Sequence, residues 1–461
     1  MTREEFEREF NSRTIAYHPE YRADDRPIII SMGNTGHSEP GHALLVALIN
    51  QLARAHRRLV LVGNLDLPLR CVDHFGFGTL RRATINLARA INPFLDITHA
   101  RTVPLEDRLI SFGIGADADV RLGCDGWLSI IGPRADVRGD RTSILGAALS
   151  ACLGAAVAFH RLLGNDETPR GWFSLWEHGQ QSTTQGPAFV GPLSLGRVLQ
   201  VGGGAVGCAL DYWLGFVGLQ GNWVICDGDI VTVSNLNRQL LFVAQDAGFP
   251  DGAALNKAIG ISRRVGEVLK QAPSWYGDDQ TIVDAVYDLV LPLANERGVR
   301  VALQGRAQTI LMHATTTPNW TAISHRHVAG HDDCIVCRLP LENEPAFGCS
   351  TAPVGARDRM DASLPFLSGL AGLLLLGDLI RLQAGHLLDR RENFTSVTVK
   401  TPRPVVRDLI WECRADCRAR MPAVTRIRRT RDLRFAHLDG DIRDEQAAKG
   451  PNDFAAGCDC A

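Results

Sequence analysis

The feature that most constrains the fold is a glycine-rich turn between two short apolar runs. Arg197-Val-Leu-Gln-Val predicts a strand, and Gly202-Gly-Gly-Ala-Val-Gly207 fits the pattern G-x-G-x-x-G. An apolar helix is expected from Cys208 to Leu219, and a second strand at Trp223-Val-Ile-Cys is closed by Asp227. This order predicts a parallel β-α-β unit with its glycine turn at the start of a helix.

Such a turn is typical of a nucleotide site. Glycines let the backbone come close to phosphate oxygens, and the free N–H groups of the helix start carry partial positive charge. The candidate contacts in the turn are Gly202, Gly204, Ala205 and Gly207, and Asp227 is placed to accept hydrogen bonds from ribose hydroxyls. This pattern alone fits a nicotinamide-dependent oxidoreductase as well as an ATP-binding enzyme.

The residues after Asp227 separate these two classes. Asp227-Gly-Asp229-Ile-Val-Thr-Val-Ser234-Asn235-Leu-Asn237-Arg238-Gln239 resembles the signature of ubiquitin-activating enzymes, ThiF and MoeB. Enzymes of this family use ATP to adenylate the C-terminal carboxylate of a ubiquitin-like protein, and hydride transfer has no need of such a cluster. The detailed resemblance covers about residues 195–385.

The resemblance implies a role for each polar residue. Asp227 would hold the ribose, Asn235 and Gln239 would orient phosphates, and Arg238 and Lys257 would bind the triphosphate. Adenylation attacks the α-phosphate and expels pyrophosphate, so that fixed cations must neutralise the charge of the departing phosphates. ATP is therefore the expected cosubstrate.

Magnesium binding departs from the family pattern. After the strand Tyr287-Asp-Leu-Val-Leu-Pro, the family places an aspartate that binds Mg²⁺, and this chain has Asn295 there. An amide is a much weaker ligand for Mg²⁺ than a carboxylate. Either Glu296 or Asp229 supplies the charge, or the triphosphate itself holds most of the ion.

Two close cysteine pairs predict a zinc site. Cys334 and Cys337 form a C-x-x-C turn, and Cys413 and Cys417 form the second pair. Four thiolates satisfy tetrahedral Zn²⁺, and such sites are usually structural. The first pair also resembles the zinc knuckle of ThiF and MoeB, although the second pair is one residue wider than usual. The alternative is two thiol pairs without a metal.

Cys349 is the expected nucleophile. It lies in a Gly/Pro-rich segment before a long apolar helix expected at residues 362–383. In family members that form a thioester, the connection between the zinc knuckle and that helix carries the cysteine. The alternatives for Cys349 are a third structural thiol or a residue inherited from a sulfur-carrier relative.

The first half is expected to be a degenerate copy of the second. Arg26-Pro-Ile-Ile-Ile-Ser-Met predicts a strand, Gly33 to His37 a loop, and Gly41 to Ala55 a helix, but the loop lacks the G-x-G-x-x-G spacing. The fold class is therefore α/β with two Rossmann-like halves, the first inactive and the second active. The expected segments are an inactive domain at 1–190, the nucleotide-binding part of the active domain at 191–330, the zinc knuckle and cysteine loop at 331–361, the rest of the active domain at 362–421, and a tail at 422–461.

An N-terminal arginine completes the predicted site. Dimeric relatives donate such an arginine to the phosphates across their interface, and the charged helix around Glu5 to Arg13 resembles that element. Arg13, and next Arg8, are the candidates, although charged helices are usually only solvated. We expect either a monomer with an internal pseudo-dimer or a homodimer.

Composition argues against several partners. A formal charge of -2 gives no general attraction to nucleic acid or to an anionic membrane. The longest apolar stretch, Leu364 to Ile380, is interrupted by Ser368 and Asp378, which favours a buried helix over a membrane span. Met1 to Arg13 does not resemble a signal peptide, so a cytoplasmic protein is expected. Twelve cysteines in such a chain indicate metal ligands, a nucleophile or buried thiols rather than disulfides.

The predicted reaction uses ATP and Mg²⁺ to adenylate a ubiquitin-like protein, transfers it to Cys349 as a thioester, and passes it to a conjugating enzyme. The resemblance extends to the activating enzyme of a bacterial ubiquitin-like conjugation operon of the Bil antiphage kind. The alternatives are a sulfur-carrier adenylyltransferase, a nicotinamide-dependent oxidoreductase and a non-catalytic scaffold.

Overall fold

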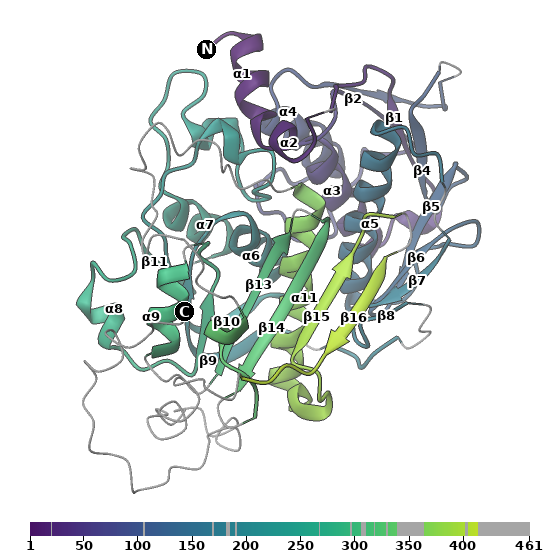
Figure 1. Ribbon diagram of the computed structural model, residues 1–461. Helices are drawn as coiled ribbons and strands as arrows, with labels where there is room; N and C mark the ends of the chain where they lie inside the picture. Colours follow the sequence, from purple (N-terminus) through teal and green to yellow (C-terminus); the bar gives the residue numbers. More distant parts are fainter. Residues whose placement is uncertain are drawn as a thin grey trace, which may run out of the picture.

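The chain forms two sheets that follow one another in the sequence (Figure 1). The computed structural model describes residues 1–338 and 364–413, apart from short gaps at 20, 105–106, 168–169, 181–184, 190, 267, 296, 306–309, 318, 329–330 and 402–403. Within these residues each sheet has eight strands.

The first sheet has the strand order β3-β2-β1-β4-β5-β6-β7-β8. Neighbouring strands are parallel from β3 to β5 and antiparallel from β5 to β8. Its strands are β1 (Ile28–Met32), β2 (Arg58–Val62), β3 (Asp96–Ala100), β4 (Ile110–Ile114), β5 (Val120–Asp125), β6 (Leu128–Ile131), β7 (Gly171–Ser174) and β8 (Gly179–Gln180).

The second sheet repeats this topology with the order β11-β10-β9-β12-β13-β14-β15-β16. It too is parallel over its first five strands and antiparallel over the rest. The expectation of two Rossmann-like halves is confirmed by these matching orders. Its strands are β9 (Leu193–Val201), β10 (Leu219–Cys226), β11 (Leu269–Ala272), β12 (Leu289–Pro292), β13 (Ile310–Thr317), β14 (Thr321–Val328), β15 (Phe394–Thr398) and β16 (Val405–Leu409).

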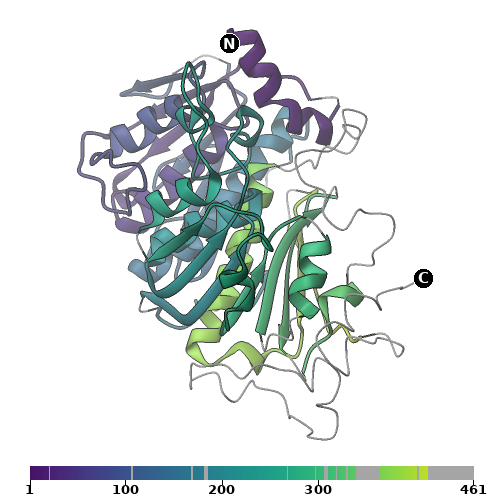
Figure 2. The ribbon, with the colours of Figure 1, turned by 90° about the vertical axis from the view of Figure 1, so that its left-hand side faces the viewer.

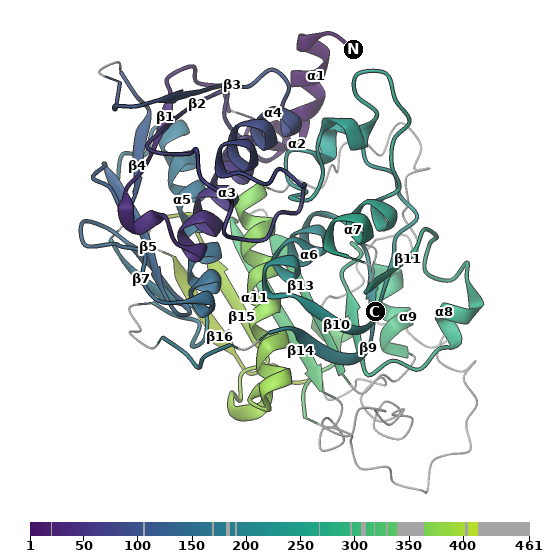
Figure 3. The same cartoon turned by 180° about the vertical axis from the view of Figure 1, so that it is seen from behind.

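Four apolar helices join the two halves. In the first half α3 packs on α5, in the second α6 packs on α11, and α5 meets α11 between them. Figures 2 and 3 show α11 running through the middle of the molecule. The α-helices are α1 (Arg3–Phe10), α2 (Ser12–Tyr17), α3 (Glu39–Leu52), α4 (Leu87–Ile91), α5 (Ile144–Leu162), α6 (Ala205–Val217), α7 (Lys257–Val265), α8 (Gln280–Asp284), α9 (Arg297–Gly305), α10 (Ile335–Arg338) and α11 (Pro365–Ala384).

Helix α11 is the buried helix that the sequence predicted. Both helices long and apolar enough to cross a membrane, α5 with its preceding turn and α11, have 94% of their apolar windows buried inside the fold. Small residues permit close packing, because a Cβ atom at Gly372 would lie 2.6 Å from the backbone nitrogen of Leu210 in α6. These helices are therefore core elements.

The predicted β-α-β unit is present, with shifted ends. Helix α6 begins at Ala205 instead of Cys208, because Gly204 has extended backbone angles and acts as its N-cap. It ends at Val217, and Leu219 already belongs to β10. Gly218 has a φ of +81°, a conformation that glycine adopts more readily than other residues and that ends the helix.

The N-terminal helix lies against the second half. Thr2 and Glu5 form a capping box at its start. Phe6 is buried and packs edge to face on Phe249, with ring centroids 5.0 Å apart. Helix α1 also contacts the short helix η4 (Val233–Asn235). The start of the chain thus reaches the segment in which the sequence placed the phosphate-binding residues.

Candidate functional site

The glycine turn is tight on one side and open on the other. Gly202 has a φ of +108° and a Cβ atom there would lie 2.5 Å from the nitrogen of Ala294. At Gly207 a Cβ atom would lie 2.2 Å from the oxygen of Gly202. Gly204 has no described atom within 4 Å of its Cβ position. The backbone can therefore be approached at Gly204, at the start of α6.

Gln200 and Asp211 form a buried hydrogen-bonded pair next to this turn. Gln200 donates from Nε2 to the oxygen of Gly202 at 3.2 Å and to Oδ2 of Asp211 at 2.9 Å. Asp211 lies on α6, is fully buried, and its Oδ1 has no hydrogen-bond partner in the described part of the chain. Burial raises the pKa of Asp211 to about 8. The neutral carboxylic acid is therefore the favoured form at pH 7.

Asp227 closes β10 and binds the turn. Its Oδ2 accepts a hydrogen bond from the Gly203 amide at 2.6 Å, and its Oδ1 accepts one from the Asp229 amide at 2.9 Å. Burial raises the pKa of Asp227, and the nearby positive charge of Lys257 opposes that rise. The carboxylate predicted to hold a ribose is thus fixed beside the glycine turn.

Lys257 joins the same cluster. Its Nζ lies 2.7 Å from Oδ2 of Asp229, and its side chain is almost fully buried. Asn256 caps α7 and donates from Nδ2 to the carbonyls of Asp227 and Asp229, at 3.0 Å each. Lys257, Asp229 and Asp227 therefore form one connected group with the glycine turn.

The polar side chains of Asn235, Arg238 and Gln239 are buried, and the first two are hydrogen-bonded to neighbouring residues. Arg238 is buried and donates from Nη1 to the Ser234 oxygen at 2.6 Å and to Oδ1 of Asn237 at 3.1 Å. Asn235 accepts from the amide of Thr232 at 3.0 Å, and Gln239 is 1% exposed. Contacts of Arg238, Asn235 and Gln239 with phosphates stay predictions.

The N-terminal segment reaches this loop from within the same chain. Asn237 donates from Nδ2 to the hydroxyl of Thr14 at 3.2 Å. The neighbouring residue is Arg13, the predicted phosphate-binding arginine, and its role stays a prediction. The sequence analysis missed Thr14, because a threonine in a short polar helix carries no distinguishing pattern.

The expected magnesium ligands fall at the end of β12. Asn295 is exposed and follows Ala294, the residue that approaches Gly202. Of the two described carboxylates beside the turn, Asp227 is buried and the side chain of Asp229 is 35% exposed. Glu296 lies outside the described residues. The donor set close to the turn thus contains a carboxylate and an amide oxygen.

The corresponding turn of the first half differs in length from the turn at Gly202. Its glycine at the end of β1, Gly33, would place a Cβ atom 1.9 Å from the Gly115 oxygen. The turn is longer than its counterpart, and Thr35 donates from Oγ1 to Asp136 at 2.6 Å. Gly63 follows β2 where Asp227 follows β10. The first half therefore has a glycine at the position of the carboxylate that is predicted to hold the ribose.

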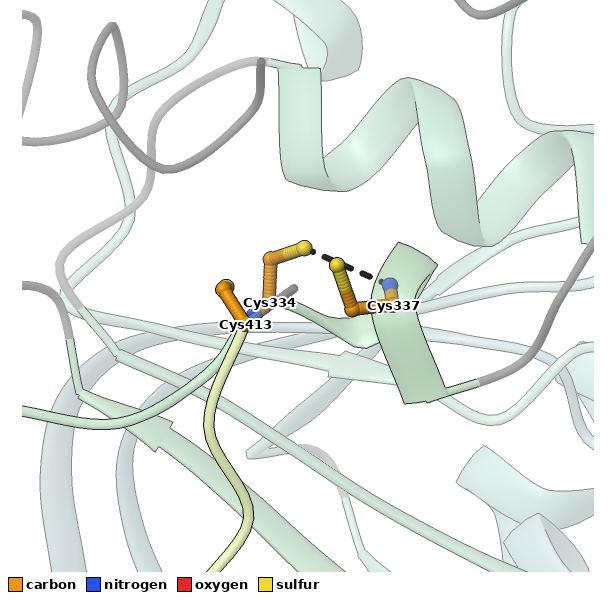
Figure 4. A group of neighbouring side chains, drawn as sticks. All are labelled: Cys334, Cys337 and Cys413. Atoms are coloured by element: carbon orange, nitrogen blue, oxygen red, sulfur yellow. Dashed lines mark hydrogen bonds between the residues drawn. The ribbon is translucent and has the colours of Figure 1, made fainter. Parts of the chain in front are cut away.

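Three of the four predicted zinc ligands lie together (Figure 4). The Sγ atoms of Cys334, Cys337 and Cys413 all lie within 4.8 Å of one another. The Cys334 amide donates to Sγ of Cys413 at 3.1 Å, and the Cys337 amide donates to Sγ of Cys334 at 3.4 Å. Cys417 and the predicted nucleophile Cys349 lie outside the described residues.

A buried polar network fixes this cysteine cluster to the second sheet. Asp333, next to Cys334, accepts hydrogen bonds at Oδ1 from His325 Nε2 at 2.8 Å and from Asn393 Nδ2 at 2.9 Å. Asn393 also pairs with the backbone of Trp411, just before Cys413. Both sides of the cluster are therefore held by the strands β14 and β15.

Residues 186–407 match the model of the ThiF family, so the second half of the chain carries a ThiF family domain. No curated protein sequence matches the chain.

Solved structures of MccB resemble the chain at low identity. MccB of E. coli with MccA-N7isoASN is 16% identical with a TM-score of 0.38, over 49% of this chain and 66% of that one, just under two thirds. E. coli MccB with ATP is 17% identical with a TM-score of 0.39, over 50% and 68%. The microcin C7 biosynthetic enzyme MccB with N-formylated MccA is 14% identical with a TM-score of 0.39, over 65% and 97%.

The buried Asp211 predicts an unusual pH dependence of stability. Its pKa rises from 3.8 to about 8 on folding, so the folded chain retains a proton that the unfolded chain releases. This contribution is fully present below pH 4 and is lost as the pH rises toward 8. Asp211→Asn keeps the hydrogen bond from Gln200 and removes the titration. Relative to wild type, the variant should gain roughly 1.4 kcal/mol per pH unit between pH 5 and 7.

Urea unfolding of both proteins at pH 5, 6, 7 and 8 measures this difference. A constant difference in unfolding free energy across that range would contradict the assignment.

Proposed function

We propose that this chain is an ATP-dependent enzyme that adenylates the C-terminal carboxylate of a protein or peptide. The observation that carries the proposal is the connected group of Asp227, Asp229 and Lys257 at an open glycine turn, within the segment that matches the ThiF family. The first half, which has Gly63 where the second half has Asp227, is proposed to be a non-catalytic partner. We expect the enzyme to act in the cytoplasm.

The geometry supports a division of roles around the nucleotide. The amides at the start of α6 offer hydrogen bonds to phosphate oxygens at the one open glycine, Gly204. Asp227 receives the ribose hydroxyls, and Lys257 and Arg238 neutralise the charge that develops on departing pyrophosphate. Arg13 adds a further positive charge from the N-terminal segment. Binding ATP would draw Lys257 and Arg238 away from their present oxygen partners.

Magnesium would be held by few protein ligands. Asp229 supplies the carboxylate and Asn295 an amide oxygen, and Glu296 is the further candidate in sequence. Mg²⁺ commonly uses one or two carboxylates together with substrate phosphates. The ion would screen the charge of the triphosphate while these residues keep it in place.

The substrate is proposed from the family and not from the site. Structures of E. coli MccB were solved with ATP and, separately, with MccA. For this chain we propose a ubiquitin-like protein, which passes from the adenylate to Cys349 and then to a conjugating enzyme. A bacterial antiphage operon is the proposed setting.

Nucleotide binding tests the first step. Purified protein is titrated with Mg²⁺ and AMPCPP, an ATP analogue that cannot release pyrophosphate, and separately with NAD⁺. Lys257→Ala and Arg238→Ala should each weaken AMPCPP binding at least about 10-fold, since they remove charge-assisted contacts to phosphate. Lys270→Ala and Arg263→Ala, which remove exposed cations nearby, should leave it unchanged. Tight NAD⁺ binding without AMPCPP binding would favour an oxidoreductase.

Thioester formation tests the role of Cys349. The enzyme is incubated with ATP and the ubiquitin-like protein encoded beside it, and a covalent adduct that thiols cleave is expected on a non-reducing gel. Cys349→Ala should abolish the adduct and retain AMPCPP binding, whereas Cys152→Ala, at a buried core thiol, should retain both. An adduct that survives in Cys349→Ala would show that another thiol accepts the acyl group.

The cysteine cluster suits a structural zinc ion. Three thiols with amide hydrogen bonds to two of them provide soft ligands, and Cys417 is the proposed fourth. Purified protein should contain about one zinc per chain by elemental analysis. Cys413→Ser should lose the metal and lower the melting temperature, and Cys124→Ser, at a buried thiol of the first half, should keep the metal. Full zinc content in Cys413→Ser would exclude the cluster as the site.

A further inference from the structure

A fully buried arginine of the first half reaches into the second half. Arg54 follows α3, has no exposed surface, and donates from Nε to Oδ1 of Asn50 at 2.9 Å. Its Nη1 donates to the Leu236 carbonyl, and its Nη2 donates to the carbonyls of Leu240 and Phe242 at 3.0 Å each. One guanidinium group thus donates hydrogen bonds to three backbone carbonyl oxygens of a single segment.

That segment, residues 236–242, contains Asn237, Arg238 and Gln239. It forms turns and has no strand or helix ladder to satisfy its carbonyls. Buried carbonyl groups need donors, and here the donors come from the other half of the chain. Asn50 adds a further hydrogen bond, from Nδ2 to the Leu240 oxygen at 3.0 Å.

Arg54 forms no salt bridge with the residues that the structure describes. Every hydrogen bond that Arg54 makes to the described residues ends on a neutral oxygen. Burial lowers the pKa of Arg54 to about 9, which still leaves it charged at neutral pH. Burying a cation without a carboxylate partner costs free energy unless all its hydrogen-bond donors are satisfied. The planar guanidinium group can donate to several carbonyl oxygens at once. The position of the Arg54 side chain therefore depends on the conformation of residues 236–242, and that conformation depends in turn on the hydrogen bonds from Arg54.

We propose that Arg54 is a positioning residue of the nucleotide site, which fixes residues 236–242 so that Arg238 faces the triphosphate. The link to ATP rests on the proposed function, whereas the ordering of the segment does not. The first half would then act on catalysis by holding a loop, without binding nucleotide itself.

The test variant is Arg54→Lys, because an ammonium group has its donors on one nitrogen and cannot serve three spread carbonyls. Arg381→Lys is the matched control. Arg381 is also buried and also joins the halves, donating to the Leu175 oxygen at 3.3 Å and to Asp378 at 2.8 Å, but it does not contact residues 236–242.

Amide hydrogen exchange without nucleotide gives the first readout. In Arg54→Lys, the peptide covering residues 236–242 should exchange at least 10-fold faster than in wild type. In Arg381→Lys that peptide should match wild type, even if the melting temperature falls equally. Unchanged exchange in folded Arg54→Lys would overturn the inference. If Arg54→Lys does not fold, Asn50→Ala removes the second donor to Leu240 and is measured in its place.

AMPCPP titration gives the second readout. Binding to Arg54→Lys should be about 10-fold weaker than to wild type and to Arg381→Lys. Faster exchange with unchanged AMPCPP affinity would overturn the positioning role. If wild type itself binds no AMPCPP, the proposed function fails, and hydrogen exchange alone decides whether Arg54 orders the segment.

Discussion

Packing of α5 against α11 is the interaction on which the rest of the structure depends. The two helices occupy equivalent places in two sheets of the same topology, and their contact joins the two halves. Side chains of the first half also contact loops of the second. Phe75 of the first half lies under the guanidinium of Arg264, at 4.7 Å, while Arg54 and Thr14 reach the segment after η4. The candidate site is therefore built from both halves, although its glycine turn, Asp227 and Lys257 belong to one.

The two glycine turns share one packing constraint and differ in length. Both keep a glycine in the first turn of the following helix, because a Cβ atom at Gly41 or Gly207 would lie 2.1 or 2.2 Å from a backbone oxygen of its own turn. That glycine serves the packing of helix on strand. Room for a phosphate depends instead on the length of the turn. Six residues lie between β1 and α3 in the first half, and three lie between β9 and α6 in the second. The two halves thus share a fold although their turns differ in length.

Local patterns in the sequence predicted local structure well. The strands and helix around Gly202, the placement of Asp227 and the buried helix α11 depend on neighbouring residues, and the structure contains them. The proximity of Cys413 to Cys334 and Cys337 was also predicted, because two close pairs of cysteines are typical ligands of a zinc ion. The antiparallel strands β13 to β16 were not predicted, and the pairing of β14 with β15 joins residues as distant as His325 and Phe394. Thr14 and Arg54 were missed for the same reason: their partners lie some 180 to 220 residues away.

A buried arginine also shows how the first half supports a segment of the second. Residues 236–242 can satisfy few of their carbonyls within their own half, where Arg264 donates to the Leu241 oxygen and is already paired with Asp246. The remaining oxygens of Leu236, Leu240 and Phe242 face the first half and accept from Arg54. If the first half were absent, these carbonyls would turn to water and the segment would lose its single conformation. We therefore expect the second half alone to hold residues 236–242 less firmly than the full chain does.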